Sequence, residues 1–346
     1  MSYFTYDKAV VEKAQETIDT MVIPQGALGK MEEQLIKLYK AWNQLHQEIK
    51  AKHYIFAASN GVAKTGVVSY PSNISYWQAQ LMVEGKATIS RFCQTNAIPY
   101  QVVDVGIDSK KAVGLDYKVA RGTANFLEEP AMTRDEFEKA VAAGRACVQQ
   151  AKADGYNLLS FGEMGIGNTT TSSAVLSFIT DAKAEDIVGY GANKRSPEVI
   201  ARKIEALRYA HETYGKGIQN VEEALICVGG FNLAALYGAM RACADSRLPF
   251  VIDGFITAVA FAAAVQMDER VAHMAFPSHW SREPGMKAAL ALGHIEEHDV
   301  LLRLDLALGE GTGAVFEVVL LRSFVDAMWQ EARMGELIEA LSDTDV

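Results

Sequence analysis

Two acidic residues of this chain lie among glycines. Glu163 stands in FGEMGIGNTTTSSAVL, residues 161–176, and Glu310 stands in LALGEGTGAV, residues 306–315. A carboxylate without bulky neighbours can be approached and buried by a ligand, which raises its pKa toward that of a general base. Glu310 is therefore a candidate base. An acid in the first turn of the last helix, where it complements the helix dipole, is an equally good interpretation.

The glycines around Glu163 predict an anion site. An apolar run at 157–161 precedes them, and a hydroxyl-rich stretch that becomes helical follows them. A strand that passes through bare backbone into a helix presents free N–H groups to a phosphate. The spacing matches neither the nucleotide-triphosphate loop nor the dinucleotide fingerprint. A tight strand-to-helix turn with no ligand explains these glycines about as well.

Other polar residues follow apolar runs in the same way. GYGANKRS, from Gly189, and GEGTG, from Gly309, add exposed backbone, and Lys203 on a following helix could reach a phosphate. Together these loops predict a phosphorylated small molecule as ligand. A single lysine is more often part of a solvated helix face. Asp104 and Asp253 could be structural caps, and a buried histidine with satisfied hydrogen bonds is the favoured interpretation of His279.

The composition excludes several classes of function. Subtracting 43 acids from 33 bases gives a net charge of −10 with no basic cluster, so nucleic acid is not an expected partner. The four cysteines and seven histidines show no metal-ligand spacing, so we expect no metal. The N-terminus has no signal-peptide pattern, and charged residues or glycines interrupt the apolar runs. We therefore expect a cytoplasmic protein that does not enter membranes.

Short apolar runs alternate with helical patterns along most of the chain. Expected strands are HYIFAASNG, YQVVDVGID, NLLSFGEMGIG, LPFVIDGF, HMAFPSH and LLRLDLALGEG. Expected helices lie at 6–20, 27–46, 75–95, 133–154, 169–180, 196–215, 231–245, 255–267 and 313–333. This alternation predicts an α/β fold, a parallel sheet with helices on both faces. Function in such sheets collects in the loops at the carboxyl ends of the strands.

Long stretches of the chain resemble the nicotinate-nucleotide:dimethylbenzimidazole phosphoribosyltransferase family. They include IPQGALGKMEEQ, GTANFLEEPAMTRDE, FGEMGIGNTTTSSAVL, FVIDGFITAVA, SHWSREPG and LALGEGTGA, and they cover nearly the whole chain. The resemblance implies a doubly wound, Rossmann-like parallel sheet. It also implies a small helical domain, residues 1–48 plus 318–346, beside a large catalytic domain, residues 49–317. It further implies a dimer whose subunits help to close each other's active sites.

The resemblance also implies roles for individual residues. Glu310 takes the proton of the incoming aromatic nucleophile, and Glu163 lies near the ribose of nicotinate mononucleotide. The other implied substrate-binding residues are Gly165, Ile166, Gly167, Asn168, Thr169, Gly191 and Lys203 for the phosphate, and Met164 and Leu308 for the aromatic ring. The pyridinium leaving group carries its own activation, so neither a metal nor a redox cofactor is implied. A carboxylate near the ribose favours the positive charge that develops at C1′.

The chain also departs from the usual pattern of the family. Ser59 and Asn60 replace Asp-His, Asn232 replaces a glutamate, and GYGAN replaces Gly-Arg-Gly-Thr-Gly. In the segment expected to line the aromatic pocket, Ser69 matches the family. Trp77 replaces a glutamine there, and Gln78 and Leu81 replace Met and Asn.

This pattern of departures resembles the branch of two-subunit phenol/p-cresol phosphoribosyltransferases. A phenol, with a pKa of about 10, needs stronger deprotonation than a benzimidazole nitrogen. The expected partners are nicotinate mononucleotide, a phenolic or benzimidazole acceptor, and a paralogous subunit or a second copy. Two alternatives remain open: a catalytically silent subunit that supports an active paralogue, and a protein that binds a phosphorylated ligand without chemistry.

Overall fold

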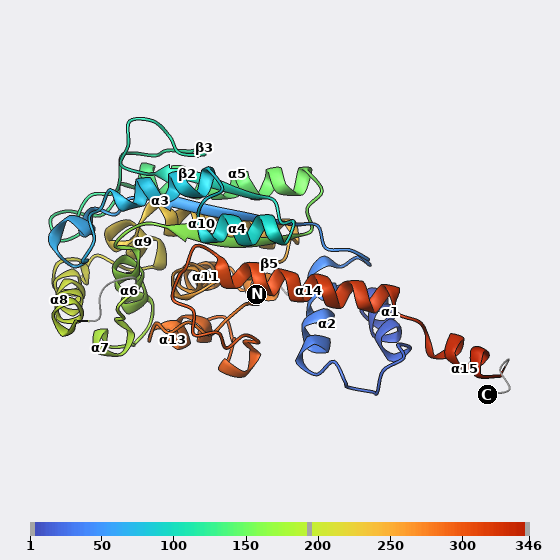
Figure 1. Ribbon diagram of the computed structural model, residues 1–346. Helices are drawn as coiled ribbons and strands as arrows, with labels where there is room; N and C mark the ends of the chain where they lie inside the picture. Colours follow the sequence, from blue (N-terminus) through green and yellow to red (C-terminus); the bar gives the residue numbers. More distant parts are fainter. Residues whose placement is uncertain (1–3, 192–195, 343–346) are drawn as a thin grey trace.

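A six-stranded parallel sheet forms the centre of the protein. The computed structural model describes residues 4–191 and 196–342. The strands lie in the order β3-β2-β1-β4-β5-β6 (Figure 1), so the chain winds outward in both directions from β1 and β4. This confirms the α/β class and the doubly wound sheet. The strands are β1 (Ala51–Ala58), β2 (Tyr100–Gly106), β3 (Leu115–Asp116), β4 (Leu158–Met164), β5 (Phe250–Ile252) and β6 (Ala275–Pro277).

Five of the six expected strands are present, and the sixth is wrong. LLRLDLALGEG forms a single bridge, between Leu302 and His279, and otherwise runs as irregular chain. Its leucines alternate with charged residues, as in a strand that is buried on one face. The segment follows β6 in the chain, however, and forms only this single bridge. The two-residue strand β3 at the sheet edge was not expected, because a pair of residues carries no periodic signal.

Most expected helices are confirmed within a few residues. The stretch 75–95 is two helices rather than one, because the chain turns at Gly85 with φ +72°. The main helices are α1 (Lys8–Asp19), α2 (Lys30–Trp42), α3 (Ile74–Val83), α4 (Thr88–Thr95), α5 (Arg134–Ala153), α6 (Asn168–Ile179), α8 (Pro197–Tyr214), α10 (Phe231–Ser246), α11 (Phe255–Met267) and α14 (Thr312–Gln330). Helices not expected from the sequence are η1 (Gly61–Thr65), α7 (Ala184–Ile187), α9 (Val221–Val228), α12 (Arg270–Met274), α13 (Met286–Ala291), η2 (Glu297–Asp299) and α15 (Met334–Ser342).

Both faces of the sheet are covered, and β1 shows why. Tyr54, Phe56 and Ala58 belong to the apolar cluster that includes α5 and α10, whereas Ile55 and Ala57 belong to the cluster that includes α3, α4 and α14. Successive side chains of a strand point to opposite faces, so a strand buried on both sides must be apolar at every position. The continuous run YIFAA meets this requirement.

The first two helices lie against the C-terminal part of the chain. Figure 1 shows α1 and α2 beside the far end of α14, with α15 extending beyond them. The indole of Trp329 donates to the Tyr39 hydroxyl at 2.7 Å, and Met21 forms an isolated bridge with Arg333. These contacts join the segments that were expected to form a small helical domain. The division at residues 48 and 318 stays a prediction.

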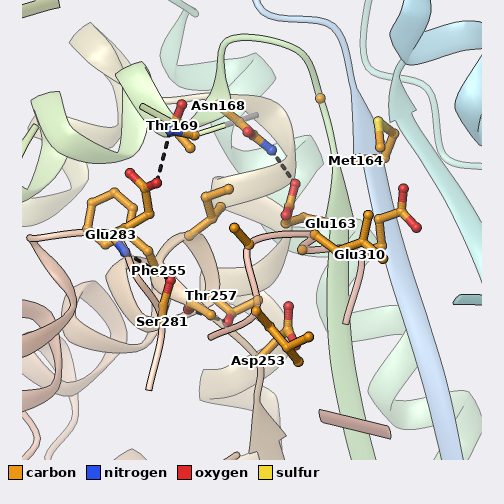
Figure 2. Close-up of a pocket in the computed structure, with 18 of the residues that line it drawn as sticks. Glu163, Met164, Asn168, Thr169, Asp253, Phe255, Thr257, Ser281, Glu283 and Glu310 are labelled. Carbon is orange, nitrogen blue, oxygen red and sulfur yellow. Dashed lines mark hydrogen bonds between the residues drawn. The ribbon is translucent and has the colours of Figure 1, made fainter. Parts of the chain in front are cut away.

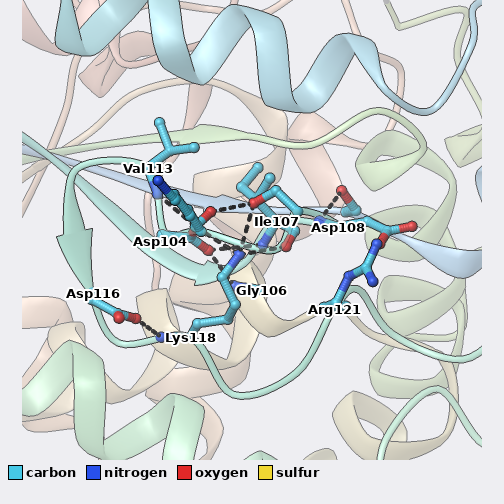
Figure 3. A network of polar contacts seen from close by, with 11 residues as sticks. Asp104, Gly106, Ile107, Asp108, Val113, Asp116, Lys118 and Arg121 are labelled. Atoms are coloured by element: carbon cyan, nitrogen blue, oxygen red, sulfur yellow. Dashed lines mark hydrogen bonds and ion pairs between the residues drawn. The ribbon is translucent and has the colours of Figure 1, made fainter.

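Asp104, at the end of β2, has a structural role. Figure 3 shows its carboxylate accepting from the backbone N–H groups of Gly106, Ile107 and Val113 at 2.8–3.0 Å. It also pairs with Lys118 at 2.9 Å. Because the carboxylate is buried, these donors and the ammonium compensate for its lost hydration. The interpretation of Asp104 as a structural cap is confirmed.

Candidate active site

One cavity lies at the carboxyl ends of β4 and β5 and brings most of the expected site residues together. Figure 2 shows Glu283 and Thr169 toward one side, Asn168 and Glu163 between, and Met164 and Glu310 toward the other. The expected residues that line it are Glu163, Met164, Gly165, Ile166, Asn168, Thr169, Gly191, Leu308 and Glu310. Additional lining residues include Asp253, Phe255, Thr257, His279, Ser281 and Glu283.

Four expected site residues do not line this cavity. Gly167 is the N-cap of α6, with φ +93°, and Lys203 reaches the cavity wall through Thr169. Ser69 precedes α3, and Trp77 on α3 is 60% exposed. The roles of Ser69 and Trp77 in binding an aromatic acceptor therefore stay predictions.

Glu163 is the last residue but one of β4 and is buried in the cavity wall. Asn168, at the start of α6, donates a side-chain N–H to its carboxylate. The opposite loop approaches so closely that a Cβ on Gly309 would lie 2.8 Å from Glu163 Oε1. Burial raises the pKa of Glu163 to about 8, the charges of Asp253 and Glu310 act in the same direction, and the bond from Asn168 opposes them. A nearby positive charge would favour its ionised form.

Glu310 lies in a strained position immediately before α14. Its backbone has φ +65°, a region that side chains rarely adopt, and the helix N-cap is the next residue, Gly311. Gln78 of α3 donates to Glu310 Oε1 at 2.8 Å, while Oε2 is buried with no hydrogen-bond partner among the described residues. Burial raises the pKa of Glu310 to about 7, and the charge of Asp253 acts in the same direction, whereas Gln78 and the backbone N–H of Ile89 oppose it. Glu310 thus lies outside the first helical turn.

His53, in the middle of β1, holds the backbone of Glu310. Burial lowers the pKa of His53 to about 4, so its ring is neutral. Nε2 lies 3.2 Å from the Glu310 carbonyl, which can only accept, and Nδ1 lies 2.8 Å from the Ser160 hydroxyl. The Nε2–H therefore donates to Glu310, and Ser160 donates to Nδ1. No sequence signal pointed to His53, because a separation of 257 residues along the chain hides the contact.

The two acidic loops touch each other through their main chains. A Cβ on Gly162 would lie 2.0 Å from the Glu310 carbonyl oxygen, and one on Gly311 would lie 2.1 Å from the His53 ring. Any side chain at either position would separate the loops. These two positions therefore require glycine, because neighbouring parts of the chain approach them too closely for a side chain. The sequence shows the glycines but not this reason for them.

Asp253, after β5, orients the loop of Glu310. Its carboxylate accepts from the backbone N–H groups of Gly311, Gly313 and Ala314 at 2.8–3.2 Å. This confirms the interpretation of Asp253 as a cap, here for α14. Its negative charge also raises the pKa of both Glu163 and Glu310, an effect that the sequence did not reveal.

A buried lysine lies behind the far end of the cavity. Lys203 is 1% exposed, so the solvated-face interpretation is wrong. Its Nζ donates to the Gly189 carbonyl at 2.7 Å and to Thr169 Oγ1 at 3.2 Å. Burial lowers its pKa to about 8, and the charge of Glu283 opposes this effect. Glu283, which the sequence did not single out, accepts from the Gly191 N–H at 2.9 Å.

Two departures from the family pattern are neighbours behind the 165–169 loop. Asn60 donates to the Ile166 carbonyl at 3.2 Å, and a Cβ on Gly230 would lie within 2.7 Å of both Asn60 Oδ1 and Asn232 Oδ1. Asn60 and Asn232 therefore lie side by side behind the loop, and Asn60 supports it through this hydrogen bond. Of the GYGAN departure, Ala192 and Asn193 lie outside the described residues.

His279 also lines the cavity, and it is buried beside Asp253. Its Nδ1 lies 3.1 Å from the Ser278 hydroxyl and 3.9 Å from Asp253 Oδ1. His279 is therefore buried, as expected, with one hydrogen bond to its ring among the described residues. Across the described ranges, 4–191 and 196–342, no cluster of three His, Cys, Asp or Glu side chains could hold a metal ion. None of the described helices is long and apolar enough to cross a membrane.

Comparisons with known proteins agree with this geometry. A family model described as phosphoribosyltransferase matches residues 4–336. The nicotinate-nucleotide--dimethylbenzimidazole phosphoribosyltransferase of Acetivibrio thermocellus is 37% identical over 311 residues, covering 89% of this chain and 87% of that protein. The enzyme of the same name from Clostridium acetobutylicum is 34% identical over 318 residues, covering 90% and 89%. The crystal structure of CobT from Thermus thermophilus superimposes with a TM-score of 0.86 at 33% identity, covering 95% of this chain and 98% of that one. A model that spans nearly the whole sequence and relatives of this similarity establish that the chain belongs to the phosphoribosyltransferase family.

Proposed function

We propose that this protein transfers 5-phosphoribose from nicotinate mononucleotide to an aromatic acceptor, in the synthesis of the lower ligand of cobamides. The observation that carries the proposal is the arrangement of one cavity. Thr169 and Gly191 line one end, with the buried Lys203 behind Thr169, and two carboxyl groups with raised pKa values follow toward the other end. This order matches a phosphate, a ribose and a reacting aromatic ring.

At the phosphate end, Lys203 would supply positive charge and the N-terminus of α6 would add the positive end of its helix dipole. A helix N-terminus after a glycine loop favours an anion without any specific side chain. Thr169 and Gly191 lie beside Lys203, and Gly167 allows the turn through its φ of +93°. The phosphate would therefore anchor the nucleotide and direct C1′ toward Glu163.

At the ribose, Glu163 would stabilise the transition state by charge. The bond from C1′ to the pyridinium nitrogen breaks, nicotinate leaves with the electron pair, and positive charge develops on C1′ and the ring oxygen. A carboxylate already positioned there is stabilised in its ionised form as that charge grows. Asn168 holds it in place. The acceptor attacks from the opposite face, so the β-nucleotide becomes an α-riboside.

At the acceptor, Glu310 would remove the proton. Its Oε1 is held by Gln78, and its buried Oε2 has no hydrogen-bond partner among the described residues. With a pKa of about 7, it can accept a proton in neutral solution. Met164 and Leu308 would contact the ring. We favour phenol or p-cresol over a benzimidazole as acceptor, because residues 77, 78 and 81 of α3 depart from the family's aromatic pocket.

We further propose that the protein acts in the cytoplasm as a dimer, with itself or with a paralogous subunit. Apolar side chains exposed on α3 and α15 support an interface: Trp77, Leu81 and Val83 on the first, and Leu337, Ile338 and Leu341 on the second. A silent subunit that supports an active paralogue is the second candidate. Ser59 and Asn232, both buried at positions where the family carries a carboxylate, favour that alternative.

A direct assay separates these candidates. The protein is incubated with nicotinate mononucleotide and phenol, p-cresol or dimethylbenzimidazole, and release of nicotinate and formation of α-riboside are followed. We expect product with at least one phenol, and a loss of about 10²-fold or more in Glu310→Gln. Glu331→Gln serves as a control for the loss of a carboxylate. Activity only in a mixture with a paralogue, insensitive to Glu310→Gln, would identify the silent subunit, and no product with any acceptor would refute the transfer.

A further inference from the structure

Glu283 places a carboxylate at the end of the cavity where the proposed reaction needs a phosphate. Figure 2 shows it beside Thr169, on the side away from Glu310. Its Oε1 accepts from the Gly191 N–H at 2.9 Å, and the backbone N–H of Glu283 donates to Ser281 Oγ at 3.3 Å. Oε2 is buried without a hydrogen-bond partner among the described residues. The carboxylate is thus fixed at one oxygen and unsatisfied at the other.

The surroundings leave little room for this group to move. A Cβ on Gly189 would lie 2.0 Å from Glu283 Oε2, so the 189–191 backbone encloses the carboxylate. Lys203 on α8 donates to the Gly189 carbonyl and to Thr169, and its charge favours the ionised form of Glu283. A bound phosphate would therefore compete with Glu283 for the Gly191 N–H and for the electrostatic attraction of this ammonium.

We propose that Glu283 is an internal competitor for the phosphate, which the phosphate displaces from Gly191 while Glu283 takes up one proton from solvent. The N–H of Gly191 passes from the carboxylate to a phosphoryl oxygen, and the proton is bound at the unsatisfied Oε2. No other bond forms or breaks. Two neighbouring anions cannot share one buried cation without repulsion, and protonation of the carboxyl removes that repulsion. The inference rests on the proposed function in one respect only, that the phosphate of the substrate binds at this end of the cavity.

The groups that act on Glu283 oppose each other. Burial raises its pKa, whereas Lys203 from α8, the Gly191 N–H and Arg282 beside it in the chain favour the ionised form. From α6 the nearest contribution is the Thr169 hydroxyl, bound to Lys203. The remaining titratable residues of the cavity are Glu163, Asp253, His279 and Glu310. A dianion that engages Lys203 removes the main support for ionised Glu283, so protonation follows binding.

Calorimetry with inorganic sulfate tests this proposal without catalysis. Sulfate stays a dianion near neutral pH, so any proton exchange on binding belongs to the protein. Titration at pH 7 in two buffers of different ionisation enthalpy gives the number of protons taken up. We expect close to one for the natural protein and at least half a proton less for Glu283→Gln, with about 10-fold or more tighter sulfate binding in the variant.

Two further variants keep the test decisive. Glu205→Gln removes an exposed carboxylate from α8 and should bind sulfate as the natural protein does. Glu283→Asp shortens the side chain and withdraws it from Gly191, so sulfate should bind more tightly than to the natural protein. Weaker or equal binding in folded Glu283→Gln or Glu283→Asp, or unchanged proton uptake in Glu283→Gln, would overturn the proposal. Transfer activity in the natural protein is measured separately, so failure of the competitor leaves the proposed reaction standing, and the reverse also holds.

Discussion

Replacing Glu317 by glutamine should stabilise the protein at neutral pH. Glu317 lies on α14, is 0% exposed, and has both carboxylate oxygens without a hydrogen-bond partner among the described residues. Burial raises its pKa from 4.5 to about 8. The folded protein therefore keeps this carboxyl protonated at pH 7, while the unfolded chain ionises it.

The size of the effect follows from the two pKa values. Between pH 4.5 and about 8 the unfolded chain binds one proton fewer at this group, so the free energy of unfolding falls as pH rises. The slope is about 1.4 kcal/mol per pH unit, and pH 7 is about 2.5 units above the lower pKa, which gives about 3 kcal/mol. Above about pH 8 both states are ionised and the slope from this group ends. Glutamine does not have to bind a proton when the chain folds, so this cost is absent in the variant. Its buried amide loses hydration much as the protonated carboxyl does.

Urea unfolding at pH 4.5, 5, 6, 7 and 8 measures the difference. Glu317→Gln should exceed the natural protein by about 3 kcal/mol at pH 7 and by well under 1 kcal/mol near pH 4.5. Glu163 and Glu310 give slopes of the same sign, but they cancel in the difference between the two proteins. Glu339→Gln, an exposed carboxylate on α15, should change little at any pH. A variant that is less stable than the natural protein at pH 7, or a gap that does not widen with pH, would refute this account of Glu317.

Three further outcomes are expected from the site. The transfer rate should rise with pH through about 7 as Glu310 becomes ionised, and a rate that is flat between pH 6 and 8 would contradict its role as base. Gln78→Met removes the donor to Glu310 and should raise that apparent pKa by roughly 0.4–1 unit, read from the same rate profile; an unmoved profile would show that the bond has no effect. Gly311→Ala places a methyl group 2.1 Å from the His53 ring at a φ of +93°, so the melting temperature should fall by several degrees. Gly26 has a similar positive φ but open space around it, so Gly26→Ala measures the part of that loss that comes from the backbone alone.

The sequence was sufficient for the centre of the fold. Runs such as YIFAA are apolar at every position, and the glycine-bounded ends of β1, β2, β4 and β5 mark where loops begin. The alternation of leucines at 301–308 led to the wrong prediction of a strand. A strand also needs a neighbouring strand to hydrogen-bond with, and this depends on residues far away in the sequence. Gly85 divides one expected helix into two by a positive φ that the pattern of apolar residues does not express.

For the site, the sequence identified residues with unusual neighbours and missed those that act from a distance. Glu163 and Glu310 were identifiable because glycines flank them, and both line one cavity. His53 supports Glu310 from β1, and its sequence neighbours are those of any strand residue. Asp253 was identified as a cap, but the sequence did not show that it orients the loop of Glu310. Glu283 stands in a loop with an arginine and a proline, where a carboxylate normally faces water. Contacts between segments 58 to 257 residues apart set these roles, so single-sequence periodicity could not reveal them.

The main-chain contact between Gly162 and Glu310 has a consequence for engineering. Because carbonyl and Cα atoms set the gap between the two acidic loops, no choice of side chain can widen it without breaking the fold there. The contact that α3 makes is different, since Gln78 reaches Glu310 through a flexible side chain. Libraries intended to admit bulkier or differently shaped acceptors should therefore vary α3 and leave the glycines untouched, so that the two carboxylates proposed to act on the substrate keep their positions.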